Sequence, residues 1–348
     1  MMRTEIHTLG EFGLIDRLTA GLETRNASTL KGVGDDCAVI HQPDKELLVT
    51  TDLLLEGIHF DLTYVPLRHL GYKAAMVNLS DICAMNGTPC QITVSLGISK
   101  RFSVEDIEEL YAGIRLACER CGVDIVGGDT VSSLTGLTLS ITAIGEAAAG
   151  DIVYRSGARE TDLICVSGNL GAAYMGLQLL EREKAVLRGN TSDMQPDFAG
   201  HEYILERQLK PEARLDIVQA LAAAGIRPTA MMDISDGLSS ELLHICRQSG
   251  CGCRLYEDRL PIDYQTAVMA EEMELDVNTC ALNGGEDYEL VFTVPLSDYE
   301  RLSDIADVHV VGHITRPELG SMLVARDGTE MELQAQGFTA FGSHADDQ

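Results

Sequence analysis

The chain has no tryptophan, and only 5% of its 348 residues are aromatic. So few rings argue against the broad base-stacking surfaces of single-strand nucleic-acid binders. Basic residues are also scarce, because 26 Lys and Arg stand against 54 Asp and Glu, which gives a net charge of −28. Such an excess of negative charge repels nucleic-acid phosphates and anionic membrane surfaces. We therefore expect neither a nucleic acid nor a membrane among the partners.

Long hydrophobic runs and disulfide patterns are missing as well. No apolar stretch approaches the length of a membrane span, and residues 1–7 contain no signal-like hydrophobic segment. The ten cysteines do not follow the spacing of a small disulfide-stapled domain. These absences predict a protein of the reducing cytoplasm. Cys118 and Cys121 have the spacing of a redox pair, and a redox-sensing role is an alternative that would make activity depend on thiol reductants.

The length favours two domains over one hydrophobic core, and 45% apolar and 23% charged residues are ordinary for a globular protein. Small residues, glycines and charges collect between Ala147 and Glu160, and we expect the boundary there. The predicted domains are residues 1–148 and 149–348.

Strand and helix patterns alternate in βαβ order through the first half of the chain. The predicted elements there are helix 10–19, strand 47–55, helix 67–85, strand 91–98, helix 103–121, strand 123–126 and strand 137–145. Ser103 and Asp106 have the spacing of a helix capping box, and Gly127-Gly128-Asp129 is expected to break the short strand before it.

The second half predicts further strands and helices. They are strand 162–167, a helix that runs from the following glycine turn to 180, helices 201–208 and 212–224, and strands 229–234, 253–256, 288–294, 308–313 and 322–325. Residues 188–200 are expected to form a surface loop, and the tail from Ser343 is expected to be loose. The whole pattern predicts an α/β protein with mixed sheets.

Acidic residues recur beside glycines, small residues and strand ends. The clusters are Gly34-Asp35-Asp36, Thr50-Thr51-Asp52, Asn78-Leu79-Ser80-Asp81, Gly127-Gly128-Asp129, Asp233-Ile234-Ser235-Asp236-Gly237 and Asn283-Gly284-Gly285-Glu286-Asp287-Tyr288-Glu289. Carboxylates gathered in one cleft repel each other, and divalent cations remove that cost. Hard oxygen ligands suit Mg²⁺, which usually takes a few carboxylates plus phosphate oxygens. The recurrence predicts a Mg²⁺-dependent nucleotide enzyme.

Each cluster also has an ordinary structural explanation. Asp36 can belong to a surface turn, Asp52 can simply end a strand, and Asp81 can occupy an exposed helix position. Asp129 follows two glycines, where free backbone amides suit a phosphate. Asp236 can be a helix N-cap. No single cluster is specific, so the prediction depends on the set.

As a set, these residues resemble the thiamine-monophosphate kinase family, which belongs to the aminoimidazole-ribonucleotide-synthetase-like ATP-binding superfamily. The resemblance runs from Gly10-Glu11-Phe12 to Gly337-Phe338 and keeps the order and approximate spacing of the motifs. Besides the acidic clusters it includes Gly57-Ile58-His59-Phe60, Arg155-Ser156-Gly157 and Leu209-Lys210-Pro211.

The resemblance implies transfer of the γ-phosphoryl group of ATP to thiamine monophosphate, which gives thiamine diphosphate. It also implies a homodimer with an N-terminal α/β domain that pairs across the dimer and a C-terminal α/β domain. The implied metal ligands are Asp36, Thr50, Thr51, Asp52, Asp81, Asp129, Asp233 and Asp236, of which Asp52, Asp81 and Asp129 act in catalysis through several Mg²⁺ ions. The implied ATP contacts are Gly128, Asp129, Arg155, Ser235 and Tyr111. The implied substrate contacts are His59, Glu286 and Phe341, with Phe338 as the other C-terminal aromatic candidate.

Two motifs of other kinases, one phosphate-binding and one catalytic, are absent from the sequence. It has neither a Gly-x-x-x-x-Gly-Lys-Ser/Thr loop nor a His-Arg-Asp catalytic loop. Several Mg²⁺ ions held by distributed aspartates would supply the missing positive charge. The acceptor is an already ionised phosphate, so we expect direct in-line transfer without a general base or a phosphoenzyme. The alternatives are a sister synthetase such as aminoimidazole ribonucleotide synthetase, a selenophosphate synthetase, and a catalytically silent nucleotide- or metal-binding subunit.

Overall fold

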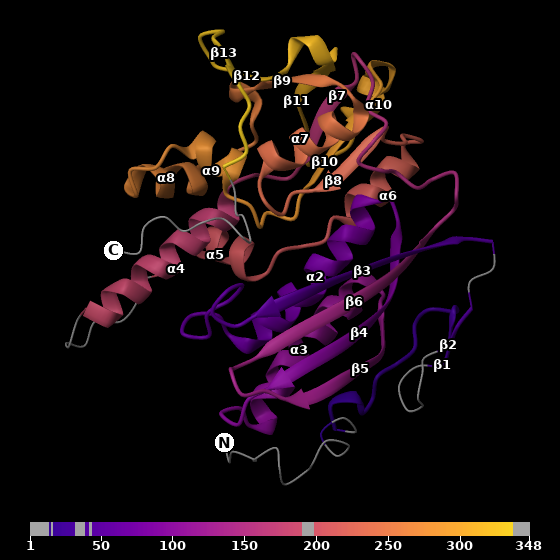
Figure 1. Ribbon diagram of the computed structural model, residues 1–348, viewed down its shortest axis with the longest axis vertical. Coiled ribbons are helices and arrows are strands. Elements are labelled where there is room, and N and C mark those ends of the chain that lie inside the picture. Colours follow the sequence, from indigo (N-terminus) through magenta and orange to yellow (C-terminus); the bar gives the residue numbers. More distant parts are fainter. Residues whose placement is uncertain (1–13, 15–16, 32–38, 42–43, 190–197, 337–348) are drawn as a thin grey trace. The chain divides into compact units, whose positions relative to one another are not determined.

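The computed structural model describes residues 14, 17–31, 39–41, 44–189 and 198–336 (Figure 1). The chain packs into two units. The first contains Met1–Val153, Leu180–Asp197 and Leu209–Arg227, and the second contains Tyr154–Leu179, Phe198–Gln208 and Pro228–Gln348. Segments of the second half thus pack with the first unit. The predicted boundary at residue 148 stays a prediction.

The first unit is built on a four-stranded sheet in the order β3-β6-β4-β5. The strands are β3 (Glu46–Leu55), β4 (Thr88–Ile98), β5 (Asp124–Ser132) and β6 (Thr138–Ala147). Only β4 and β5 run parallel; the other pairs are antiparallel. The helices α2 (Leu67–Ala84) and α3 (Val104–Cys121) pack against each other on one face of this sheet (Figure 1). The short strands β1 (Thr29–Lys31) and β2 (Val39–Ile40) pair separately, and α6 (Leu215–Ala223) also belongs to this unit.

Local signals set the ends of α3. Ser103 accepts a hydrogen bond from the backbone N–H of Asp106, and the Asp106 side chain accepts one from the backbone N–H of Ser103. This confirms the predicted capping box. The helix ends at Gly122, whose φ of 70° lies in the left-handed region that glycine enters at little cost.

The Gly-Gly-Asp segment of β5 differs from the prediction. The strand was expected to break at Gly127, but it continues to Ser132. A register shift places Thr93 opposite Gly127 after Ile92 pairs with Ile125, so Val126 is an extra residue in the ladder. Beyond this bulge the parallel ladder to β4 resumes, so that both glycines are part of the strand.

The second unit is built on a seven-stranded sheet in the order β13-β12-β9-β11-β7-β10-β8. Its strands are β7 (Leu163–Ser167), β8 (Ala230–Asp233), β9 (Gly252–Tyr256), β10 (Leu290–Val294), β11 (Val308–Thr315), β12 (Ser321–Val324) and β13 (Glu330–Glu332). Every neighbouring pair is antiparallel except β12 and β9. One apolar core joins this sheet to α7 (Leu238–Ser249) and α9 (Val277–Asn283).

A second apolar cluster joins α4 (Ala172–Gly189), α5 (Glu202–Leu209), α8 (Tyr264–Glu272) and α9. The remaining short elements are η2 (Glu257–Arg259), η3 (Leu296–Asp298), α10 (Tyr299–Leu302) and η4 (Pro317–Leu319). Mixed sheets with packed helices confirm the predicted fold class. No helix in the described residues is both long and apolar enough to cross a membrane.

Candidate functional site

The Thr50-Thr51-Asp52 and Asn78–Asp81 motifs meet between β3 and α2. Thr50 Oγ1 donates a hydrogen bond to Asp81 Oδ2 at 2.6 Å, and the backbone N–H of Asp52 donates one to Asn78 Oδ1 at 3.0 Å. Alternate residues of a strand face the same side of the sheet. Thr50 and Asp52 therefore share the side that α2 covers, and the structure brings these two sequence clusters together.

The electrostatics of the Asp52 and Asp81 carboxyl groups favour a bound cation. Burial, together with the negative charge of Asp81, raises the pKa of Asp52 to about 6. Two carboxylates and a hydroxyl at one place are hard oxygen donors, and an unneutralised carboxylate pair costs free energy. The donor set of Thr50, Asp52 and Asp81 therefore fits a divalent cation such as Mg²⁺.

Two other predicted ligands of this unit lie elsewhere on the sheet. Thr51 is exposed, donates to the carbonyl oxygen of Ile141 at 3.1 Å and accepts from Thr142 Oγ1 at 3.1 Å. Asp129 is on β5, three strand positions from β3. With about 4.8 Å between neighbouring strands, that is about 14 Å. Within this unit the sheet does not bring Asp129 to the Asp52–Asp81 pair.

In the second unit, the Asp233–Gly237 motif and the Gly284–Glu289 motif lie side by side. Strand β8 pairs with β10, so that Asp233 is opposite Leu290. Beyond the strands, the backbone N–H of Glu286 donates to the carbonyl oxygen of Ser235 at 2.7 Å, and that of Tyr288 donates to the carbonyl oxygen of Ile234 at 2.9 Å. A Cβ on Gly285 would lie 2.6 Å from the Ser235 carbonyl oxygen. Glycine is therefore required for the two motifs to approach this closely.

Charged side chains surround this junction. Burial, with the negative charge of Glu286, raises the pKa of Asp236, whereas the nearby His244 lowers it. Burial lowers the pKa of His244, and the positive charges of Arg247 and Arg155 add to that effect. His244 therefore lies within electrostatic range of both Arg155 and Asp236, and Asp236 lies within range of Glu286. Asp236 is not the N-cap of α7, because Gly237 occupies that position.

Glu241, on the first turns of α7, is a buried carboxyl group that the sequence interpretation missed. Its Oε1 accepts a hydrogen bond from the backbone N–H of Asp236 at 3.2 Å. Burial raises its pKa to about 8, and the negative charges of Asp236 and Asp233 act in the same direction. Glu241 therefore holds the turn that carries Ser235 and Asp236.

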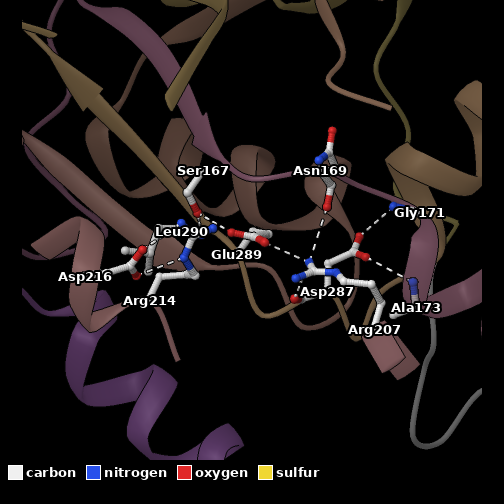
Figure 2. Close-up of polar contacts among 10 residues, drawn as sticks. All are labelled: Ser167, Asn169, Gly171, Ala173, Arg207, Arg214, Asp216, Asp287, Glu289 and Leu290. Atoms are coloured by element: carbon white, nitrogen blue, oxygen red, sulfur yellow. Dashed lines mark hydrogen bonds and ion pairs between the residues drawn. The ribbon is translucent and has the colours of Figure 1, made fainter. Parts of the chain in front are cut away.

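A buried ionic network holds the acidic end of the Gly284–Glu289 motif (Figure 2). Arg207 Nη2 on α5 donates to Glu289 Oε1 at 2.7 Å and to the backbone oxygens of Asp287 and Asn169 at 3.2 and 3.4 Å. Glu289 Oε2 accepts from Ser167 Oγ at 2.5 Å, and the same hydroxyl accepts from the backbone N–H of Leu290 at 2.8 Å. Strands β7 and β10 are thereby tied to α5.

The Asp287 carboxylate lies at the N-terminus of α4. It accepts from the backbone N–H of Gly171 at 2.8 Å and from that of Ala173 at 3.4 Å (Figure 2). A carboxylate at this end satisfies amides that have no partner inside the helix. Burial raises the pKa of Asp287 to about 7, although Arg207 and the two amides act in the opposite direction.

The backbone of the Gly284–Glu289 motif is strained. Gly285, Glu286 and Tyr288 have φ values of 70°, 59° and 51°. Glutamate and tyrosine rarely enter this left-handed region, at a cost of order 1–3 kcal/mol for each residue. Such strain persists only where surrounding contacts fix the chain, and it collects at functional sites.

The remaining predicted contacts differ in their surroundings. His59 is exposed in the loop after β3, and its Nδ1 accepts from the backbone N–H of Leu55 at 3.0 Å. Tyr111 is buried on α3, and burial raises its pKa to about 12. Asp36, Phe338 and Phe341 lie outside the described residues, as do most of the expected helix 10–19, most of the loop 188–200 and the tail from Ser343. These role assignments stay predictions.

The clusters of His, Cys, Asp and Glu side chains bear on the metal and redox hypotheses. Within the described ranges, no three His, Cys, Asp or Glu side chains form a group able to hold a metal ion by themselves. Cys118 and Cys121 are free thiols on α3. Burial raises the pKa of both, to about 11 for Cys121. A raised thiol pKa lowers reactivity, so the structure gives no support to a redox pair at this position.

Arg207 and Gln208 were missed by the sequence interpretation. Gln208 Nε2 donates to Glu286 Oε2 at 2.9 Å. Both residues directly precede the Leu209-Lys210-Pro211 motif, and that proximity was the only sequence signal of a functional role. Two polar side chains on a helix otherwise indicate a solvated face.

Comparison with known proteins gives a consistent family assignment. The profile of the AIR synthase related protein N-terminal domain matches residues 34–147, and that of the C-terminal domain matches residues 148–323. Thiamine-monophosphate kinase of Aquifex aeolicus is 35% identical over 89% of this chain and 93% of its own length. That of Salmonella typhimurium is 36% identical over 96% of this chain and 99% of its own length.

A solved structure described as AaThiL complexed with AMPPCP and TMP has the same fold. It is 33% identical, covers 98% of this chain and 99% of its own, and superposes with a TM-score of 0.73.

Proposed function

The chain belongs to the AIR synthase related family and, within it, to the thiamine-monophosphate kinases, and from this premise we propose how its own residues perform that reaction. It is an enzyme that phosphorylates thiamine monophosphate with ATP and releases thiamine diphosphate and ADP. The observation that carries this function is the full-length similarity to a protein solved with AMPPCP and TMP. A sister synthetase is not favoured, since the curated relatives at 30–36% identity are thiamine-monophosphate kinases.

Mg²⁺ is the proposed metal, and Thr50, Asp52 and Asp81 are its best supported ligands. Thr50 Oγ1 bonds Asp81 Oδ2, and burial, together with the negative charge of Asp81, raises the pKa of Asp52. When bound, the metal would offset phosphate charge and align the reacting oxygens. Several Mg²⁺ ions are proposed, so that the other proposed ligands, Asp36, Thr51, Asp129, Asp233 and Asp236, need not bind the same ion as Asp52 and Asp81.

ATP and substrate contacts are proposed on the residues that the family resemblance implies. Arg155 and Ser235 contact the nucleotide, together with Gly128, Asp129 and Tyr111. Arg155 and Asp236 both lie close enough to His244 to shift its pKa, which supports a role for Arg155 as a phosphate contact near the Asp233–Gly237 motif. His59, Glu286 and Phe341 contact thiamine monophosphate.

No residue of this chain needs to remove a proton from the acceptor. The phosphate of thiamine monophosphate is already ionised at neutral pH, so positioning and charge neutralisation suffice for in-line attack. We therefore propose direct transfer without a phosphoenzyme. Incubation with γ-labelled ATP alone should leave no label on the acid-quenched protein.

The proposed assembly is a homodimer that pairs through the first unit. Val49 and Leu53 on β3 are 65% and 53% exposed, although both are large and apolar. Exposed apolar side chains along a sheet face favour burial against another surface. All cysteines in the described part of the chain are free thiols, which supports a cytoplasmic location.

The decisive assay measures thiamine diphosphate by chromatography after incubation with ATP and thiamine monophosphate, with and without Mg²⁺. Asp52→Asn and Asp129→Asn should abolish turnover while circular dichroism remains unchanged. Near-normal rates of either variant at saturating Mg²⁺ would refute that metal assignment. The acceptor of the sister synthetase in place of thiamine monophosphate tests the synthetase alternative.

A further inference from the structure

Helix α5 contacts the Gly284–Glu289 motif at Glu286, Asp287 and Glu289 through two consecutive residues. Gln208 Nε2 donates to Glu286 Oε2 at 2.9 Å, so one side chain orients the carboxylate. Arg207 Nη2 donates to Glu289 Oε1 and to the backbone oxygen of Asp287, so the other holds the chain on the far side of Glu286. Figure 2 shows the Arg207 part of this arrangement.

The buried charges make Arg207 necessary at this place. Asp287 and Glu289 are each only 1% exposed, and buried carboxylates require a cation or hydrogen-bond donors. The guanidinium supplies both, because it ion-pairs with Glu289 and bonds the Asp287 backbone. Without it, the two carboxylates would repel each other beside a backbone that is already strained at Glu286 and Tyr288.

We propose that Arg207 and Gln208 are positioning residues that hold Glu286 in its strained conformation for contact with thiamine monophosphate. This rests on the proposed function, in which Glu286 contacts the phosphate acceptor rather than ATP. Arg207 fixes the backbone on one side of Glu286, and Gln208 fixes the rotamer of its carboxylate. Neither residue is required to touch the substrate.

The first test measures motif order without catalysis. In the native chain, the N–H groups of Glu286, Tyr288 and Leu290 are hydrogen-bonded. Hydrogen exchange of the peptide that covers residues 284–290 should accelerate at least tenfold in Arg207→Lys, because the lysine side chain is one bond shorter and its ammonium does not reach the three oxygens that Nη2 bonds. Peptides of the first unit should keep their native rates. Unchanged exchange in the 284–290 peptide would overturn the role of Arg207.

The second test separates the two substrates kinetically. Arg207→Lys and Gln208→Met should raise KM for thiamine monophosphate at least fivefold and leave KM for ATP within twofold. Arg316→Met is the matched control, because Arg316 is exposed and pairs with the exposed Glu160 at 3.3 Å; both of its KM values should stay native. Arg207→Met removes the charge altogether and should have a larger effect than Arg207→Lys, and the lysine variant decides if the methionine variant does not fold.

Two outcomes distinguish the inference from the function on which it rests. If wild-type enzyme forms thiamine diphosphate but the KM values of the folded variants rise equally, Arg207 and Gln208 are merely structural and the inference is wrong. If wild-type enzyme forms no thiamine diphosphate, the proposed function fails instead. In that case the exchange experiment still decides whether α5 holds the motif.

Discussion

Asp52 illustrates how burial prepares a single carboxyl group for a cation. Its backbone N–H is bonded to Asn78, and its side chain lies near Asp81 on the α2 side of β3. Burial and that second charge raise its pKa to about 6. A cation that needs the ionised form competes with one proton below this value, so metal affinity should fall as the pH falls.

We therefore expect the dissociation constant of Mn²⁺, a spectroscopic substitute for Mg²⁺, to be about tenfold higher at pH 5 than at pH 7. Electron paramagnetic resonance of free Mn²⁺ without nucleotide measures it, so protonation of ATP does not contribute. Asp52→Asn should bind more weakly and lose this pH dependence. An unchanged slope in the variant would assign the titration to another group.

His59 is a proposed contact of thiamine monophosphate, and its exposed location permits a substitution that leaves the fold intact. The ring is exposed, and its one described hydrogen bond is local, to the backbone of Leu55. His59→Ala should raise KM for thiamine monophosphate severalfold more than KM for ATP, with little change in melting temperature. Equal changes in the two KM values would remove His59 from the acceptor pocket.

Individual site residues were predictable from the sequence only where their motif was local. The acidic clusters stood out because each joins carboxylates to glycines or strand ends. The hydrogen bond from Thr50 to Asp81 was not predictable, because it depends on which face of β3 turns toward α2. Arg207 was not predictable either, since its partners Asp287 and Glu289 are some 80 residues away in the chain.

At the scale of elements, the predicted strands and helices were mostly confirmed where hydrophobic periodicity was strong, as in β3, α2 and α3. The helices α8 and α9 were missed. Their signals were the N-caps Asp263 and Asp276, whose side chains accept from the backbone N–H groups of Gln265 and Thr279. The prediction ended β5 too early, because glycine has a low strand propensity and the local sequence does not show that the segment pairs with β4.

Substitutions at the two glycines of β5 test whether close pairing with β4 requires glycine at these positions. A Cβ on Gly128 would lie 1.8 Å from the carbonyl oxygen of Val94, whereas a Cβ on Gly127 would meet only the Thr93 methyl group at 3.9 Å. Gly128→Ala should therefore push β5 away from β4 at a cost of about 2–3 kcal/mol. That corresponds to a melting temperature roughly 5–10 °C lower.

Gly127→Ala is the adjacent control for this experiment. It should change the melting temperature by no more than about 2 °C, because the added methyl group makes only an ordinary contact with the Thr93 methyl group and alanine restricts the unfolded chain. Differential scanning calorimetry of both variants gives the comparison. Equal losses would show that glycine is needed for conformation throughout the segment rather than for close approach at Gly128.

At the scale of the whole molecule, net charge and dimer formation oppose each other. Each copy carries a net charge of −28, so two copies repel at long range. In the proposed dimer, association through β3 would therefore depend on apolar contact of side chains such as Val49 and Leu53. Salt screens the repulsion and leaves the apolar contact in place.

We expect the dimer to tighten as NaCl rises from about 0.05 to 0.5 M, over which the Debye length shortens roughly threefold. Sedimentation velocity over a range of protein concentrations measures the dissociation constant.

Val49→Asp should shift the equilibrium toward monomer by at least tenfold, since it places a charge in the apolar contact and adds to the repulsion. Leu296→Asp is the control, because Leu296 is 58% exposed but belongs to the second unit, and it should leave the dimer intact. A Val49→Asp variant as dimeric as wild type would move the interface away from β3, and a dimer that salt weakens would mean that ion pairs rather than apolar side chains hold it.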